Sequence, residues 1–214
     1  MDRTLELDNI FLSIGSQVLF SELSCGVSGG EVLSVMGPSG CGKSSLLNII
    51  CGTLDSAFYY QGRVLLDDQP LDALPPHRRR VGLQFQDHLL FPHMTVGENL
   101  AFGLPRQFNK AEKLQKVEQA LENCGLTGVA DYQPSALSGG QRARISLMRT
   151  LLSEPKVLLL DEPFSKLDRA LREQFRTFVF QQVNRLKIPA LMVTHDAQDI
   201  EDKSRVIYLK AHSA

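Results

Sequence analysis

An apolar stretch, a glycine-rich turn and a helix-forming stretch follow one another in the first quarter of the chain. Residues 32–36 read Val-Leu-Ser-Val-Met and predict a strand, and residues 37–44 follow the pattern G-x-x-x-x-G-K-S. Glycines in such a turn let backbone N–H groups approach an anion closely, because a Cβ would occupy the space. The pattern is typical of a phosphate-binding loop, the P-loop, which leads into a helix over residues 43–50. A chance glycine-rich turn is the alternative, and its position between a predicted strand and a predicted helix argues against it.

The side chains of this loop predict a nucleoside triphosphate and a magnesium ion as ligands. Lys43 places a cation where the β- and γ-phosphates would lie, so it is also a catalytic candidate. The hydroxyl of Ser44 can bind a magnesium ion that bridges the same phosphates. The nucleotide-binding residues predicted from the motif are Gly37, Pro38, Ser39, Gly40, Cys41, Gly42, Lys43, Ser44 and Ser45.

Length and charge narrow the class of protein. The 214 residues suffice for one core, or for one core with a subdomain. Lys and Arg number 23 and Asp and Glu number 24, which gives a net charge of −1, so no nucleic-acid partner is expected. The basic cluster at residues 77–80 is best interpreted as a solvated face before a strand. The sequence has no apolar run of the ~20 residues that a membrane-spanning helix needs, and its four cysteines lack the spacing of a zinc site.

Hydrophobic periodicity predicts an α/β fold. We expect strands near residues 5–12, 17–20, 32–36, 62–66, 81–86, 157–160, 190–194 and 205–209. Helices are expected over 43–50 and 110–124, from the N-cap Ser138 to just before Glu154, and from the N-cap Asp168 through Leu186. The first, second and fourth strands predict an N-terminal antiparallel β subdomain beside a P-loop NTPase core with a mostly parallel sheet. The core comprises residues 1–86 and 155–214, and residues 87–154 form an inserted α-helical subdomain, all within a single domain.

Polar residues lie at or just after the carboxyl ends of three predicted strands: Gln86, the pair Asp161 and Glu162, and His195. Ligands of open α/β sheets gather at these ends. Asp161 is expected to hold magnesium together with Ser44, and Glu162 to polarise a water. Taken alone, a capping Asp-Glu pair or a structural histidine would be the simpler interpretation. The P-loop in the same chain favours a nucleotide site.

Residues 137–141 read Leu-Ser-Gly-Gly-Gln and lie between the P-loop and the strand that ends at Asp161. With these motifs in this order, nearly the whole chain resembles the ATP-binding cassette (ABC) ATPases. A lone pentapeptide of this kind could be a plain capped helix. The resemblance implies ATP hydrolysis and a homodimer formed with ATP. In that dimer Ser138, Gly139, Gly140 and Gln141 of one chain face the γ-phosphate bound by the other, because a helix N-terminus is an anion site.

The resemblance also implies roles for residues outside the P-loop and the pentapeptide. Gln86 matches the glutamine that senses magnesium and the attacking water, which makes it both a catalytic and a metal-binding candidate. Asp168 matches the loop that crosses the dimer interface, and His195 matches the histidine that contacts the γ-phosphate. Ile14 lies where the family usually has an aromatic residue against adenine, so Ile14 is the candidate contact to the base.

Within the family the chain resembles the ATPases of bacterial importers for thiamine, iron, sulfate and polyamines, in particular the small subunits of the YnjD type. The stretches that carry this resemblance are residues 87–91, 161–168 and 193–196. It implies an ATPase subunit that powers import through separate membrane permease subunits, with an extracytoplasmic solute-binding protein as an indirect partner. Its place would be peripheral, on the cytoplasmic side of the inner membrane. The alternatives are an exporter or lipoprotein-release ATPase and, with less resemblance, a soluble DNA-repair ATPase. The solute does not follow from the sequence.

Overall fold

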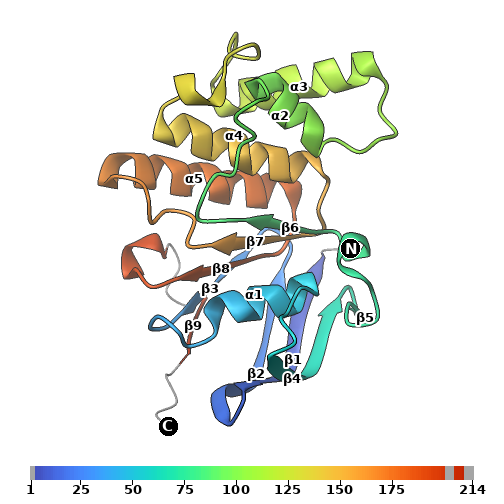
Figure 1. Cartoon of the computed structure of the whole chain (residues 1–214), viewed down its shortest axis with the longest axis vertical. Helices are drawn as coiled ribbons and strands as arrows, with labels where there is room; N and C mark the ends of the chain where they lie inside the picture. Colours follow the sequence, from blue (N-terminus) through green and yellow to red (C-terminus); the bar gives the residue numbers. More distant parts are fainter. Residues whose placement is uncertain (1–2, 201–204, 210–214) are drawn as a thin grey trace.

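The computed structural model describes residues 3–200 and 205–209 and contains two sheets (Figure 1). The antiparallel sheet has the order β2-β1-β4-β5 and consists of β1 (Thr4–Ile14), β2 (Gln17–Ser28), β4 (Phe58–Leu66) and β5 (Gln69–Pro70). The second sheet is parallel throughout and has the order β6-β7-β8-β3-β9. Its strands are β3 (Val32–Met36), β6 (Val81–Gln84), β7 (Val157–Asp161), β8 (Ala190–Thr194) and β9 (Val206–Tyr208). The predicted α/β fold class is confirmed.

Helices cover both faces of the parallel sheet. They are α1 (Lys43–Cys51), α2 (Val96–Gly103), α3 (Lys110–Cys124), α4 (Gly139–Leu152) and α5 (Arg169–Leu186), with short 3-10 turns η1 (Pro76–Arg78), η2 (Pro134–Ala136) and η3 (Ala197–Asp199). Figure 1 shows α1 between the two sheets, α4 and α5 on the other face of the parallel sheet, and α2 and α3 beyond α4. Helices α2 to α4 lie between β6 and β7 in the chain. The boundary of a helical subdomain at 87–154 stays a prediction.

The parallel sheet separates two hydrophobic cores. Successive side chains of a strand point to opposite faces, so an unbroken apolar strand feeds both cores. The residues that pack with α4 and α5 are Leu158, Leu160, Ala190 and Met192. Those that pack with α1 and the antiparallel sheet are Val157, Leu159, Leu191 and Val193. All eight are fully buried, so the predicted strand near residues 157–160 is covered on both faces.

Local capping signals place the helix ends where the sequence predicts them. Capping boxes begin α3 at Asn109 and α4 at Ser138, and the side chain of Asp168 accepts a hydrogen bond from the first turn of α5. Gly52, which follows the last residue of α1, adopts the left-handed conformation with φ of 76° and ends the helix. Helix α2 was not predicted, although Thr95 begins it with a capping box of its own.

The antiparallel sheet differs from the predicted pattern. Strand β2 continues to Ser28 and β4 already begins at Phe58. In β1 the alternation of buried and exposed side chains shifts by one residue at Asn9, whose φ is 52°. Leu5 and Leu7 are buried before the shift, and Ile10 and Leu12 are buried after it. Two leucines that lie at helical spacing from buried apolar residues are exposed, Leu114 of α3 at 60% and Leu186 of α5 at 40%.

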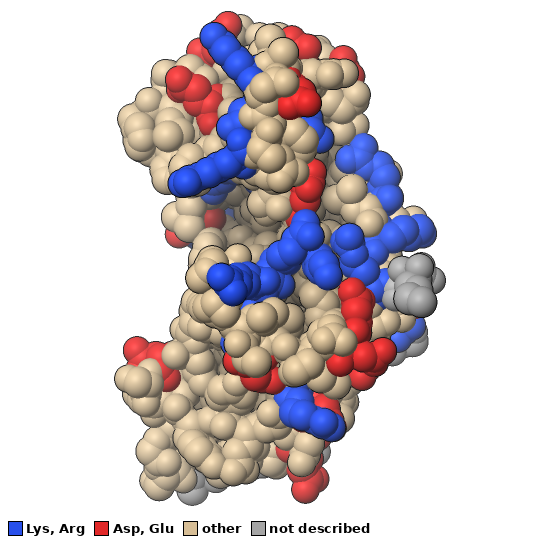
Figure 2. Space-filling view, turned by 90° about the vertical axis from the view of Figure 1, so that its right-hand side faces the viewer, with Lys and Arg blue, Asp and Glu red and all other residues tan. Residues whose placement is uncertain are grey.

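The interpretation of residues 77–80 as a solvated face is wrong for Arg79. Its side chain is buried and donates hydrogen bonds to the carbonyls of Ile49 (2.8 Å), Ile50 (3.1 Å) and Leu74 (2.9 Å). Two of these carbonyls belong to the last turn of α1, where unpaired carbonyl groups and the helix dipole favour a cation. Arg78 and Arg80 are exposed, and Figure 2 shows Lys and Arg side chains gathered across the middle of one face.

We expect the Arg79→Met variant to lose about 3 kcal/mol of unfolding free energy, because buried carbonyls lose their donor while the aliphatic packing is retained. Urea denaturation followed by circular dichroism measures the change. Arg78→Met is the matched control, and as an exposed substitution it should stay within about 0.5 kcal/mol of the wild type. Equal losses in the two variants would contradict a capping role for Arg79.

Candidate nucleotide-binding site

The P-loop, residues 37–45, joins β3 to α1 in a conformation that only glycine fits at two positions. A Cβ on Gly37 would lie 2.6 Å from the Sγ of Cys41 and 2.9 Å from the carbonyl oxygen of Leu209. A Cβ on Gly42 would lie 2.9 Å from the ring of Phe20, and the φ of Gly42 is 96°. The turn therefore packs against β2 and against Leu209, the residue after β9. Its N–H groups lie at the N-terminus of α1.

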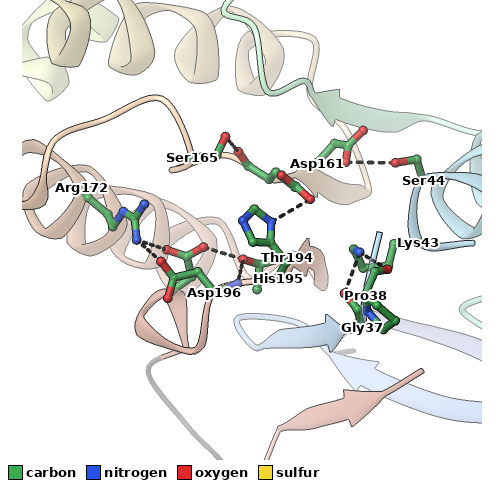
Figure 3. Close-up of polar contacts among 12 residues, drawn as sticks. Gly37, Pro38, Lys43, Ser44, Asp161, Ser165, Arg172, Thr194, His195 and Asp196 are labelled. Carbon is green, nitrogen blue, oxygen red and sulfur yellow. Dashed lines mark hydrogen bonds and ion pairs between the residues drawn. The ribbon is translucent and has the colours of Figure 1, made fainter. Parts of the chain in front are cut away.

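Lys43 turns back over this loop. Its Nζ donates hydrogen bonds to the carbonyl oxygens of Gly37 (2.8 Å) and Pro38 (2.9 Å), and the residue is only 7% exposed. Figure 3 shows the ammonium group lying against the start of the loop. The two carbonyls satisfy a cation that burial would otherwise destabilise. The loop thereby carries a positive charge within reach of any anion that binds to its N–H groups.

Ser44 and Asp161 bring two hard oxygen donors together from α1 and the end of β7. The Ser44 hydroxyl lies 3.4 Å from Oδ1 of Asp161. Burial raises the pKa of the Asp161 carboxyl, and the neighbouring Glu162 raises it further, whereas the Ser44 hydrogen bond and Lys43 act in the opposite direction. Within residues 3–200 and 205–209, no three His, Cys, Asp or Glu side chains are grouped so that they could hold a metal ion by themselves. An oxygen pair of this kind fits Mg²⁺, which takes one or two carboxylates and completes its shell with phosphates and water.

Glu162 and His195 form the next contact along the same sheet edge. The ring Nδ1 of His195 lies 3.0 Å from Oε1 of Glu162 (Figure 3). The side chain of Glu162 is 23% exposed and that of His195 is 57% exposed. The backbone of Glu162 adopts φ of 44°, and its N–H donates to the carbonyl of Val193 at 3.0 Å. Glu162 therefore leaves the strand in a sharp turn that points its carboxylate toward the histidine.

Arg172 of α5 fixes the residues on both sides of His195. Its guanidinium pairs with Asp196 and lies 3.7 Å from Oδ1 of the buried Asp199. The hydroxyl of Thr194 donates to Oδ2 of Asp199 (2.5 Å) and accepts from the N–H of Asp196 (3.0 Å). Burial raises the pKa of Asp199, whereas a hydrogen bond from the Gln198 backbone and the Arg172 pair lower that of Asp196. Figure 3 shows Arg172 and Asp196 to the left of the histidine.

A hollow of about 460 Å³ adjoins the P-loop. Its lining residues are Ile14, Gln17, Leu19, Ser39, Gly40, Gly42, Lys43, Ser44, Ser45, Phe58 and Glu162. The predicted base contact Ile14 thus lies with most of the P-loop residues. Asp161 joins this group through Ser44, and His195 joins it through Glu162.

Other predicted site residues lie apart from this hollow. Ser138, Gly140 and Gln141 line a second hollow with Arg144, Leu171 and Phe175, and these two hollows share none of their lining residues. Open space lies where a Cβ on Gly139 would project, and Asp168 is an exposed N-cap of α5. Gln86 is exposed on a bend two residues beyond β6. One chain therefore does not bring the pentapeptide to its own P-loop hollow.

Sequence reasoning missed two groups at this site. Phe58 lies in the hollow because β4 begins earlier than predicted, and the signal was a run of aromatic residues before Gly62. Arg172 was overlooked because its partners lie in a different segment, 24 and 27 residues further along the chain. A cation four residues after the capping Asp168 gives no local sign of those partners.

Residues 20–165 match the family model described as ABC transporter. The chain belongs to this family of ATP-binding proteins. It is 45% identical to the uncharacterized ABC transporter ATP-binding protein YnjD of Escherichia coli, a match that covers 93% of this chain and 92% of YnjD. The predicted resemblance to this type is confirmed. As an ABC ATP-binding protein, the chain is an ATP hydrolase.

Longer import proteins are related over the same region. The chain is 43% identical to the sulfate/thiosulfate import ATP-binding protein CysA 1 of Chromobacterium violaceum, covering 96% of this chain and 58% of that protein. It therefore spans little more than half the length of CysA 1. Its fold is similar to that of cbiO1 from Clostridium perfringens, part of the ABC transporter complex cbiONQ, with a TM-score of 0.85, 26% identity and coverage of 100% and 88%.

We expect Arg172→Met to lower the unfolding free energy by about 3 kcal/mol, because the carboxylate of Asp199 would stay buried without its cation. Urea denaturation at neutral pH measures the loss. In Arg172→Met/Asp199→Asn both charges are absent, so the double variant should recover much of the stability. If Arg172→Met unfolds at the same urea concentration as the wild type, Arg172 does not stabilise the buried carboxylate of Asp199.

Proposed function

We propose that the chain is the ATPase subunit of an importer and acts at the cytoplasmic side of the inner membrane as a peripheral subunit. Two observations support this: CysA 1 and other relatives are named as import ATP-binding proteins, and cbiO1 is part of a transporter complex. None of the helices within residues 3–200 and 205–209 is long and apolar enough to cross a bilayer. In this proposal separate membrane permease subunits carry the solute, and a solute-binding protein contacts those subunits.

The P-loop hollow is proposed to hold the triphosphate of ATP. Lys43 exchanges its two carbonyl partners for phosphate oxygens, which offer a full negative charge in the same place. The N–H groups of the loop and the start of α1 add hydrogen bonds to the anion. Ser44 and Asp161 would hold Mg²⁺, with Gln86 as a further ligand that approaches from the end of β6. When bound, the ion would neutralise charge that develops on the phosphate oxygens.

Glu162 is the proposed general base. His195 occupies Oε1 of its carboxylate, and a carboxylate has further lone pairs free to accept a proton from water. The oxygen of that water attacks the γ-phosphorus while the bond from phosphorus to the β-phosphate oxygen breaks, which leaves ADP and phosphate. The Nδ1 contact to Glu162 leaves Nε2 of His195 to face the γ-phosphate. Arg172 maintains this arrangement through Asp196 and Asp199.

A second copy of the chain is proposed to complete the site. The observation that carries this proposal is the separation of the two hollows, one with the P-loop and the other with Ser138 and Gly140. The N-terminus of α4 can serve as an anion site only for a phosphate that it can reach. In a head-to-tail homodimer, Ser138 to Gln141 of each chain would close over the ATP of the other, with Asp168 at the interface.

We expect Glu162→Gln to bind ATP but to hydrolyse it about 10²–10⁴-fold more slowly, because the amide cannot accept the proton. Two uncleaved ATP molecules should then hold the dimer closed. Size-exclusion chromatography should show a dimer with ATP and Mg²⁺ and a monomer without them. Lys43→Ala, which weakens phosphate binding, is the control and should stay monomeric in both. Hydrolysis by Glu162→Gln at the wild-type rate would remove Glu162 from the mechanism.

The transport role predicts a membrane-spanning partner. Tagged Glu162→Gln chain, expressed in its source cell, should sediment with membranes and should co-purify in mild detergent with one or two polytopic proteins in a fixed stoichiometry. Mass spectrometry identifies these proteins, and the wild-type ATPase rate should change when they are added back in liposomes. Recovery of the chain only in the supernatant, or with DNA-repair proteins, would contradict the transport role.

A further inference from the structure

The part of the P-loop hollow that lies away from the phosphate-binding residues is apolar and contains an aromatic ring. Ile14 of β1, Leu19 of β2 and Phe58 of β4 line it, and Gln17 adds a polar group. These residues come from the antiparallel sheet, whereas Ser39 to Ser45 come from the P-loop. A single hollow thus offers a polar, cationic part and an apolar part, as a nucleotide with its charged phosphates and its flat base requires.

Strand register places Phe58 beside Ile14. The two residues are direct partners in the β1–β4 pair, and Leu12 is the partner of Tyr60. Residues directly opposite in an antiparallel pair have their side chains on the same face. Leu12 is fully buried in the core around α1, so Ile14 and Phe58 continue that face to its end, where the core meets the P-loop. Ile14 is 37% exposed there.

The two neighbouring aromatic residues are directed elsewhere. Tyr59 is the partner of Ser13 on the opposite face of the sheet, is 56% exposed and packs edge-on against Phe11, with 6.3 Å between ring centroids. The hydroxyl of Tyr60 donates to Oδ1 of Asp72 at 2.9 Å, and burial raises its pKa. Of the three consecutive aromatic residues, only Phe58 lines the P-loop hollow.

We propose that Phe58 is the residue on which the base of the nucleotide stacks, with Ile14 as an apolar contact at its side. The inference rests on the proposed binding of the triphosphate at the P-loop. The aromatic surface comes from β4 rather than from the turn after β1. Because every base has a flat π-face, a stacking contact discriminates little between bases. The side-chain amide of Gln17 has both donors and an acceptor, so ATP and GTP should bind with similar affinity.

Titration of ATP, GTP and inorganic tripolyphosphate against the intact protein separates a base contact from a phosphate contact. For Phe58→Leu we expect ATP and GTP affinities to fall by about 5- to 150-fold, the range for loss of one stacked base, while tripolyphosphate affinity stays at the wild-type value. Tyr59→Leu is the matched control, since it removes an aromatic ring from the other face of the same strand. It should bind all three ligands as the wild type does.

Two further variants keep the proposal testable if Phe58→Leu folds poorly. Phe58→Trp should keep or tighten ATP binding, and Ile14→Tyr should tighten it by adding a second ring. Wild-type ATP affinity in a folded Phe58→Leu, or an equal loss of tripolyphosphate affinity, would overturn the role of Phe58. A wild-type protein that binds neither ATP nor tripolyphosphate would instead overturn the proposed phosphate site.

Discussion

A parallel sheet buried on both faces imposes the layout of the whole chain. Each return to the same end of a parallel sheet needs a crossover, and these crossovers carry the helices that cover the two faces. Only the edges of the sheet stay open to a ligand. The carboxyl ends of β3, β7 and β8 share one of these edges, so that edge collects Lys43, Asp161, Glu162 and His195 from positions spread over most of the chain.

Features of the fold that depend on neighbouring residues could be predicted from the sequence. Contiguous residues form the capping boxes at Asn109 and Ser138, and contiguous apolar residues form the buried strands. The shift in β1 could not be predicted, because it depends on distant chain: a Cβ on Gly62 would lie 2.6 Å from the carbonyl oxygen of Asn9. This close backbone approach puts both residues into positive φ and ends the simple alternation.

The residues of the candidate site also fall into those that contiguous sequence predicts and those that depend on distant parts of the chain. The P-loop is a contiguous motif, and a carboxylate after a buried strand is recognisable without coordinates. Phe58 and Arg172 were not recognisable, because one depends on strand register and the other on ion pairs across a helix and a loop. Arg79 shows how charge alone misleads: a basic residue in a polar run proves to be a buried helix cap.

The backbone of Glu162 has a consequence for how the chain would change under selection. Its φ of 44° lies in the left-handed region, where the Cβ costs roughly 1–2 kcal/mol in steric contacts that glycine does not make. Glycine at position 162 would also relieve the like charge beside the half-buried Asp161. Folding stability and the side chain at this position therefore oppose one another. A library of variants sorted only for heat resistance would be enriched in chains without Glu162, and those chains would keep the fold while losing the proposed base.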